Sequence, residues 1–221
     1  MTDFFAHIVW SEIGRATLDT LIMLGASLAL TILLGIPLGV LLFLTDEGQP
    51  ARNRPINRIV GILVNILRSI PFVILLIVMI PLTLLLVGTS LGVAGAIPPL
   101  VVGAAPFYAR LVEGALRDVP RATIEAVQAM GATRLQIVTR MLLPETLPGL
   151  ISGATITAVA LVSFTAMAGV VGAGGLGDLA IRYGYQRFQT DVMLVTVTLM
   201  VLLVQIIQFA GDRLARHFDH R

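Results

Sequence analysis

The stretch 172–177, Gly-Ala-Gly-Gly-Leu-Gly, fits the pattern G-x-G-x-x-G, and Asp178 follows it directly. In a dinucleotide-binding site these glycines bring the backbone close to a pyrophosphate. The pattern must then follow a β-strand, open a helix and precede an acidic residue about 20 positions on. Here a long apolar segment precedes the glycines, and another begins at Val192. Neither suits a strand of a βαβ unit, so we exclude dinucleotide binding.

Other catalytic chemistry is limited by the residue types that the chain lacks. It has no Cys and no Lys, so all 15 of its basic residues are Arg. Without Cys it has no disulfide, thiol nucleophile or Cys-rich metal site. Without Lys it has neither a P-loop nor Schiff-base chemistry. The three His lie near the termini, at positions 7, 217 and 220. We therefore predict no catalytic residue and no metal site, and a separate chain must hydrolyse any ATP that is used.

The composition is that of an integral membrane protein. Hydrophobic residues make up 57% of the chain and charged residues 13%, whereas a soluble domain has about 25% charged residues. In hydrocarbon, each backbone must bond within its own segment, which favours helices. Gly35 and Gly39 have the small-x3-small spacing that allows two helices to pack closely. We predict an all-α polytopic membrane protein, one domain over 1–221, with five transmembrane helices at about 17–44, 70–87, 91–111, 150–171 and 192–210.

The distribution of Arg predicts the orientation of these helices. The loop 45–58, the segment 110–149 and the C-terminal tail together carry eleven Arg, and the opposite side of the membrane carries three. Cytoplasmic loops are enriched in Arg and Lys. We therefore expect the N-terminus outside the cell and the C-terminus in the cytoplasm.

The segment at about 118–148 is too polar to span the membrane, yet it has a regular pattern. Ile124, Val127 and either Met130 or Gly131 share one helical face, and the apolar spacing continues at Leu135, Val138 and Leu142. Gly131 allows a sharp turn between two short helices. An amphipathic helix lying on lipid is one interpretation, and a pair of helices presented to a cytoplasmic protein is the one we favour.

This segment also contains a recognisable motif. Glu125-Ala126, Gly131 and Leu143-Pro144 follow the pattern E-A-A-x3-G-x9-I-x-L-P, with Val127 in place of the third-position Ala and Met141 in place of Ile. The pattern resembles the EAA motif of permease subunits in binding-protein-dependent ABC importers. The resemblance implies a type I ABC importer permease fold with a cytoplasmic coupling helix. It assigns the contact with the ATPase to Glu125, Ala126, Met130, Gly131, Leu143 and Pro144.

The glycine stretch is expected on the external side, where two interpretations remain. Glycines are common in flexible surface turns, but they also allow the backbone of an ordered loop to pass close to another chain. Three aromatic residues follow the stretch, as in an interfacial aromatic belt or a docking surface. We favour docking of an external protein or gating, at Gly172, Gly174, Gly175, Gly177, Tyr183 and Tyr185.

Longer stretches resemble one branch of these importers, the methionine-importer permeases; they are 64–81, 102–116, 130–150, 171–185 and 207–214. The resemblance implies a multi-pass protein of the bacterial inner membrane that pairs with a second copy of itself. Its other partners would be two ATPase subunits, an external substrate-binding protein or lipoprotein, and membrane lipid, with no nucleic acid. ATP and magnesium would bind the ATPase, and this chain would hold no cofactor. Permeases for glycine betaine or phosphonate-type solutes carry similar glycines and remain an alternative.

The helix at 150–171 supplies the residues that we expect in the pore. Ser163 and Thr165 offer small polar groups, and Met167 is a flexible apolar side chain that suits a gate, although ordinary packing is equally compatible. An ion-coupled transporter would need an ionisable residue at mid-membrane, and an intramembrane enzyme a pair of carboxylates there. Asp19, Arg68 and Glu113 are all expected near span ends, which argues against both classes.

Overall fold

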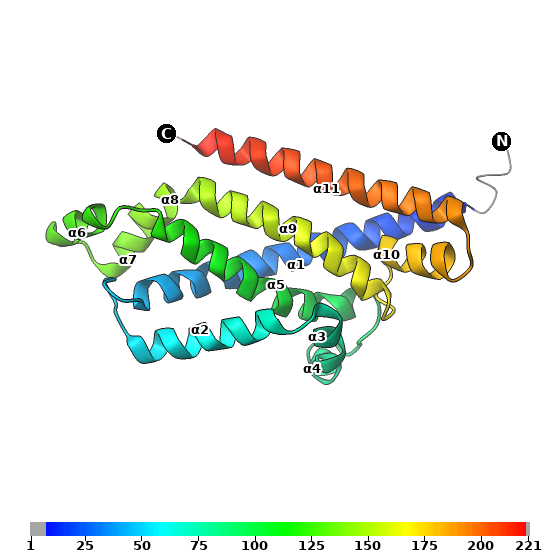
Figure 1. The fold of residues 1–221 in the computed structure, drawn as a ribbon, viewed down its shortest axis with the longest axis horizontal. Coiled ribbons are helices and arrows are strands. Elements are labelled where there is room, and N and C mark those ends of the chain that lie inside the picture. The colour runs from blue at the N-terminus through cyan, green and yellow to red at the C-terminus, as the bar shows by residue number, and fades with distance from the viewer. Residues whose placement is uncertain (1–7, 220–221) are drawn as a thin grey trace.

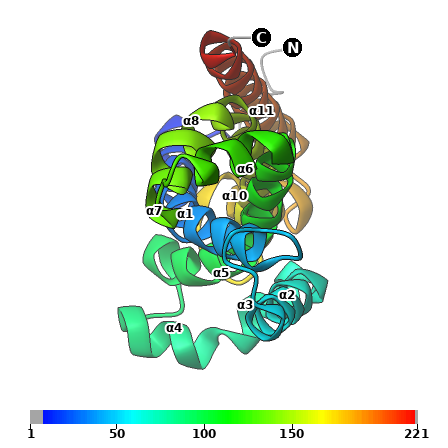
Figure 2. The ribbon, with the colours of Figure 1, turned by 90° about the vertical axis from the view of Figure 1, so that its left-hand side faces the viewer.

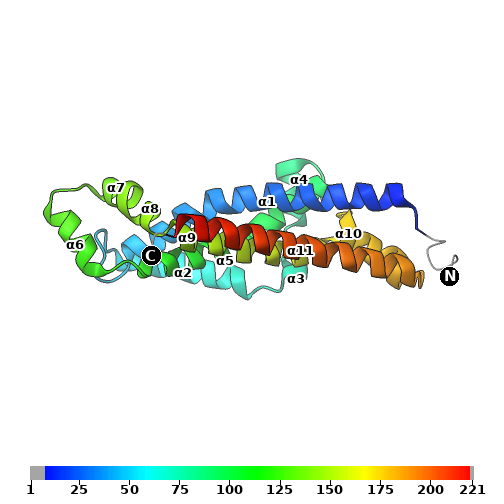
Figure 3. The ribbon, with the colours of Figure 1, turned by 90° about the horizontal axis from the view of Figure 1, so that it is seen from above.

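The computed structural model describes residues 8–219, and within this range the chain forms helices and no β-strand. Four long helices run side by side along the longest axis of the molecule (Figures 1 and 3): α1 (Trp10–Thr45), α5 (Gly92–Arg117), α9 (Leu147–Gly169) and α11 (Thr190–Phe218). Each is long and apolar enough to cross a membrane. The all-α fold class is confirmed, and these helices coincide with four of the five predicted spans.

The remaining span, predicted as one helix over 70–87, is wrong in its form. The structure has two helices here, α3 (Phe72–Val78) and α4 (Ile80–Val87), and they follow another helix, α2 (Arg54–Ser69). α2 and α3 meet at a bend of 104° and together are apolar and long enough for a broken span. The bend follows from Pro71, because a residue before proline avoids the helical region, and Ile70 has the extended angles φ −79° and ψ 124°.

The helix α2 changes the expected position of Arg68. Residues 54–58 were expected in a loop, but α2 begins at Arg54 and lies beside α1 and α5 in the bundle (Figure 1). If α2 and α3 form one broken span, Arg68 lies inside that span and not at its start. Its guanidinium is 5.9 Å from the ring centroid of Phe107, in the middle of α5. Glu113 does lie near a helix end, as expected, four residues before the last residue of α5.

The core of the bundle depends on small residues where α1 crosses α5. Gly39 faces Ala109 and Val112 so closely that an added Cβ would lie 2.5 Å from the Ala109 carbonyl oxygen, and Gly35 packs on Tyr108 in the same way. The structure thus confirms close helix packing at the small-x3-small pattern.

Two groups of short helices lie at opposite ends of the bundle (Figure 1), and in the view along the bundle the group with α6, α7 and α8 is nearest the viewer (Figure 2). One end, which we call the α6–α8 end, also holds the C-terminal end of α11 and consists of α6 (Arg121–Ala129), α7 (Arg134–Ile137), the π-helical turn η1 (Val138–Leu142) and α8 (Leu143–Glu145). The other, which we call the α10 end, lies beside the start of α1 and consists of α10 (Gly175–Leu179) and the π-helical turn η2 (Ala180–Tyr185).

Candidate functional site

The helices at the α6–α8 end pack one apolar face against the bundle. Ile124, Ile137 and Leu142 are buried in a cluster with Phe43 of α1 and Leu116 of α5. The sequence pattern had placed Met130 on the same face as Ile124, but its side chain is 78% exposed. The buried apolar face therefore holds α6 and α7 against the bundle, and the side chain of Met130 points toward solvent.

The residues of the EAA-like motif that remain accessible gather at the turn between α6 and α7. Glu125 is exposed and its carboxylate lies 3.4 Å from the Arg121 guanidinium, and Ala126 and Met130 are also exposed. Gly131 forms the turn with φ +83°, and an added Cβ there would meet no atom within 4 Å. A glycine is needed for its backbone conformation and not for space. We call Glu125, Ala126, Met130 and Gly131 the tip.

The second half of the motif lies at the base of the same structure. Leu143 packs partly buried against the cluster that holds Ile124, and Pro144 is exposed at the first turn of α8. The turn expected at Gly131 between two short helices is confirmed, and α7 begins after it with a capping box of Thr133 and Gln136 that was not predicted. The signal was available, because Thr followed three positions later by Gln is typical of a helix start. The motif is thus divided between an exposed tip and a packed base.

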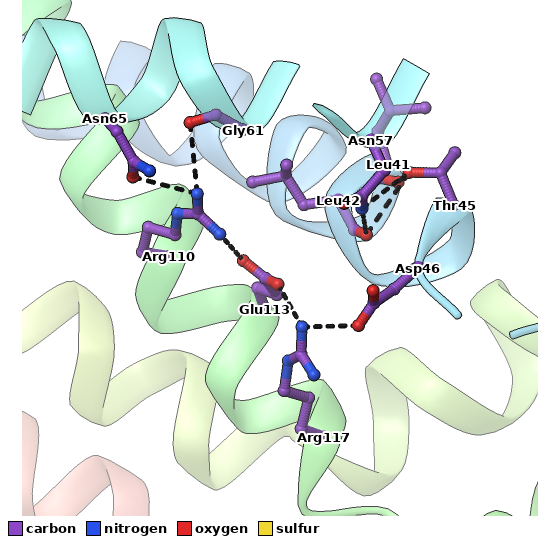
Figure 4. A network of polar contacts seen from close by, with 10 residues as sticks. All are labelled: Leu41, Leu42, Thr45, Asp46, Asn57, Gly61, Asn65, Arg110, Glu113 and Arg117. Atoms are coloured by element: carbon purple, nitrogen blue, oxygen red, sulfur yellow. Dashed lines mark hydrogen bonds and ion pairs between the residues drawn. The ribbon is translucent and has the colours of Figure 1, made fainter. Parts of the chain in front are cut away.

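A network of charged and polar residues joins α5 to α1 and α2 near this end (Figure 4). The buried carboxylate of Glu113 accepts hydrogen bonds from Arg110 and Arg117, both at 2.7 Å. Arg117 also donates to Asp46, just after α1, at 2.7 Å. Arg110 reaches α2, where it donates to the Gly61 carbonyl at 3.3 Å and to Asn65 at 3.0 Å.

This network fixes the helix that leads into the tip. A buried carboxylate is tolerated when cations and hydrogen bonds compensate its loss of water, and Glu113 has two such partners on its own helix. In the sequence, Arg110 and Arg117 served only to predict the orientation of the helices. Their spacing of three and four residues from Glu113 indicates pairing on one helix face, but the contacts with α1 and α2 have no local signal.

The glycine stretch at the α10 end packs within its own chain. Gly172, Gly174 and Gly175 all have positive φ, between 78° and 84°. Gly175 contacts Thr20 of α1, whose hydroxyl accepts a hydrogen bond from the Leu176 amide at 2.9 Å. Gly177 lies directly on the backbone of Ala166 in α9. These contacts favour the ordered loop over a flexible turn, and the close approach they permit is to α1 and α9.

Aromatic side chains after the glycines differ in their exposure. Tyr183 is partly buried, with the guanidinium groups of Arg182 and Arg187 at 5.0 and 4.5 Å from its ring centroid. Tyr185 and Phe188 are 70% and 86% exposed. The α10 end thus presents two aromatic side chains outward, which is compatible both with a docking surface and with an interfacial aromatic belt.

Of the three pore candidates, two lie together. Ser163 and Met167, one helical turn apart on α9, line a groove of about 500 Å³ against α11. Thr165 is buried on another side of α9, and its hydroxyl donates to the Val162 carbonyl at 2.7 Å. Its hydroxyl is therefore used within the helix. Among residues 8–219, no three His, Asp or Glu side chains are grouped to hold a metal ion.

Residues 35–221 match the family model described as "Binding-protein-dependent transport system inner membrane component". The chain is 53% identical over 206 residues to the probable D-methionine transport system permease protein MetI of Vibrio cholerae, covering 93% of this chain and 92% of that protein. It is 46% identical to the methionine import system permease protein MetP of Bacillus subtilis, covering 99% and 98%. A chain from an inward-facing structure of the MetNI methionine ABC transporter superposes with a TM-score of 0.94 at 50% identity, covering 96% and 98%.

Proposed function

Because the chain belongs to the family of binding-protein-dependent transport system inner membrane components, we propose that it is the permease subunit of an ATP-driven importer of methionine. The observation that carries the proposal is the match in sequence and structure, over nearly the whole of both chains, to permeases named for methionine transport. The substrate would include both the L and the D forms. Glycine betaine and phosphonate permeases, the alternative from the sequence, are not favoured by these relatives.

The tip is the surface that we assign to the ATPase. It is exposed, it lies at one end of the molecule, and its base is packed on α1 and α5. Closure of two ATPase subunits on ATP and magnesium would displace the tip. The buried residues Ile124, Ile137 and Leu142 would carry that displacement into α1 and α5, because packed cores transmit movement. The Glu113 network would keep α1, α2 and α5 together as they move.

The remaining assignments follow from the position of the tip. If the α6–α8 end faces the cytoplasm, the described start of α1 lies at the external end and α11 ends in the cytoplasm, as the distribution of Arg indicates. The exposed Tyr185 at the α10 end is then available to an external binding protein. Met167 and Ser163 would line the passage where a second copy of the chain completes it.

The substrate is tested by uptake in bacterial cells that lack their own methionine importer and express this chain with its ATPase and binding protein. We expect saturable uptake of labelled methionine, which unlabelled L- or D-methionine reduces and excess glycine betaine does not. If excess glycine betaine abolishes the uptake of labelled methionine, methionine is not the preferred substrate and glycine betaine takes its place in the proposal. No methionine uptake by an assembled complex would refute the substrate and leave the family assignment standing.

A further inference from the structure

A cavity of about 550 Å³ opens where α2 ends and α3 begins. Its walls come from the break between the two helices, from Gly103 and Phe107 of α5, and from Ala160 and Phe164 of α9. Two of its aromatic rings, Phe72 and Phe164, are stacked at a centroid distance of 4.4 Å. Such a size is typical of sites for small molecules, and the walls combine aromatic surface with the guanidinium of Arg68.

The cavity lies partway along the bundle, and Arg68 and Ser69 on its wall are exposed in the single chain. Arg68 is 14 residues after the first residue of α2, which is about 21 Å along a helix. Phe107, beside it, is the sixteenth of the 26 residues of α5. Half the hydrocarbon thickness of a bilayer is about 15 Å. A guanidinium at this depth is costly in lipid and needs an anion or water.

The part of the chain that the structure describes supplies no such anion to Arg68. On the same helices, Arg110 and Arg117 contact Glu113, Arg54 contacts Glu47, and Arg58 is exposed near the start of α2. Between residues 8 and 219, no carboxylate forms an ion pair with Arg68, whose one recorded partner is the ring of Phe107. The positive charge of Arg68 must therefore be compensated by water or by an anion that enters the cavity.

A polar stripe leads from the α6–α8 end to this position. Polar residues and one glycine recur at spacings of three and four residues along one face of α2, and apolar residues occupy the opposite face. The members of this stripe are Arg54, Asn57, Arg58, Gly61, Asn65, Arg68 and Ser69. Asn57 and Asn65 bond to α1 and α5, so α2 stands in the bundle and does not lie on a membrane surface. Polar groups at such depth are expected where a helix lines water.

We infer that this cavity is a substrate site within the membrane, in which Arg68 binds the carboxylate of an apolar zwitterionic amino acid. A guanidinium pairs with a carboxylate through two parallel hydrogen bonds. The rings of Phe72, Phe107 and Phe164 surround the remaining volume with apolar surface, which suits an uncharged side chain. The inference rests on the proposed function, since that function supplies methionine as the amino acid.

The first test measures methionine transport in proteoliposomes that contain the full complex with its ATPase and binding protein. Arg68→Gln removes the charge, and we expect the transport rate to fall about tenfold or more, while binding-protein-stimulated ATP hydrolysis stays at the wild-type level. Arg68→Lys keeps the charge without the fork and should fall in between. Arg58→Gln, on the same polar stripe near the start of α2, is the matched control and should transport normally. Wild-type transport by Arg68→Gln would overturn the inference.

The second test does not depend on the identity of the substrate. Because the chain has no native Cys, Ser69→Cys provides a single thiol at the cavity. We expect a charged, water-soluble thiol reagent to label Ser69→Cys in the assembled complex, methionine to slow the labelling, and Leu63→Cys on the opposite face of α2 to remain unlabelled. Two results together would overturn the inference: the reagent does not label Ser69→Cys, and Arg68→Gln fails to assemble. They would show that Arg68 forms an ion pair with the second copy of the chain. If the wild-type complex moves no methionine while Ser69→Cys is labelled, the proposed substrate is refuted but the aqueous cavity is not.

Discussion

Replacing Glu113 by Gln tests whether the network at the end of α5 stabilises the fold. The substitution keeps the shape of the side chain and removes its charge, leaving Arg110 and Arg117 without their shared anion. Removal of one partner from a buried ion pair costs about 3–5 kcal/mol. The Arg110–Glu113 side chains are 26% and 6% exposed, so this pair approaches that case. Arg117 is 53% exposed, and its solvent-screened pair adds about 0–1 kcal/mol.

We therefore expect Glu113→Gln to lower the free energy of unfolding by about 3 kcal/mol. For a chain of this size, that corresponds to a decrease in Tm of about 6–12 °C, measured by thermal unfolding of the purified permease in detergent. Glu47→Gln is the matched control, because the Glu47–Arg54 pair has a distance of 2.6 Å but is 65–67% exposed. It should lower Tm by less than about 4 °C. Equal Tm values for the two variants would refute the assignment of Glu113 as a buried link.

Three further substitutions probe the tip and the helix crossing. Glu125→Arg reverses an exposed charge at the tip and should abolish methionine uptake while membrane insertion, measured by the amount in the membrane fraction, is unchanged. Gly131→Ala forces a side chain into the turn at φ +83°, costs about 1 kcal/mol or more, and should reduce uptake and binding of the ATPase. Gly39→Ala places a methyl group against the Ala109 carbonyl and should lower Tm by several degrees, as expected for overpacking by about 1–3 kcal/mol.

The two glycine substitutions each have a matched control, and all three predictions have an outcome that contradicts them. Gly114→Ala lies in helical backbone with open space, and Gly25→Ala lies in α1 with open space, so neither should reduce uptake or Tm. The tip assignment fails if Glu125→Arg transports normally. If Gly131→Ala and Gly114→Ala give the same uptake, the turn does not require glycine. If Gly39→Ala and Gly25→Ala have the same Tm, the crossing of α1 and α5 is not tightly packed.

Hydropathy was sufficient to predict four of the long helices, because a membrane helix needs only a continuous apolar segment. It failed at 70–87, where the break at Pro71 turns the chain by 104°. Hydropathy also missed α2, because its polar residues give it the composition of a loop. Only their spacing of three and four residues along one face shows that the segment is helical. Because α2 was missed, Arg68 was expected at the start of a span and not between the two halves of a broken one.

The candidate site was predictable where a motif carried it. The tip follows from the spacing of Glu125 and Gly131, although the exposure of Met130 depended on how α6 packs on α1 and α5. The network around Glu113 was not predictable, since Asp46 and Asn65 reach it from two other segments of the chain. The internal packing of Gly175 on Thr20 likewise joins residues that are far apart in sequence.

Photo-crosslinking of the assembled transporter tests most directly that the tip receives the ATPase. A photoreactive amino acid is placed at Met130 of the tip or, in a second variant, at Phe188 of the α10 end, both of which are highly exposed. The account predicts a crosslink from position 130 to the ATPase subunit, and none from position 188. A crosslink to the ATPase from position 188, or its absence from position 130 in an active complex, would contradict both the coupling role and the orientation.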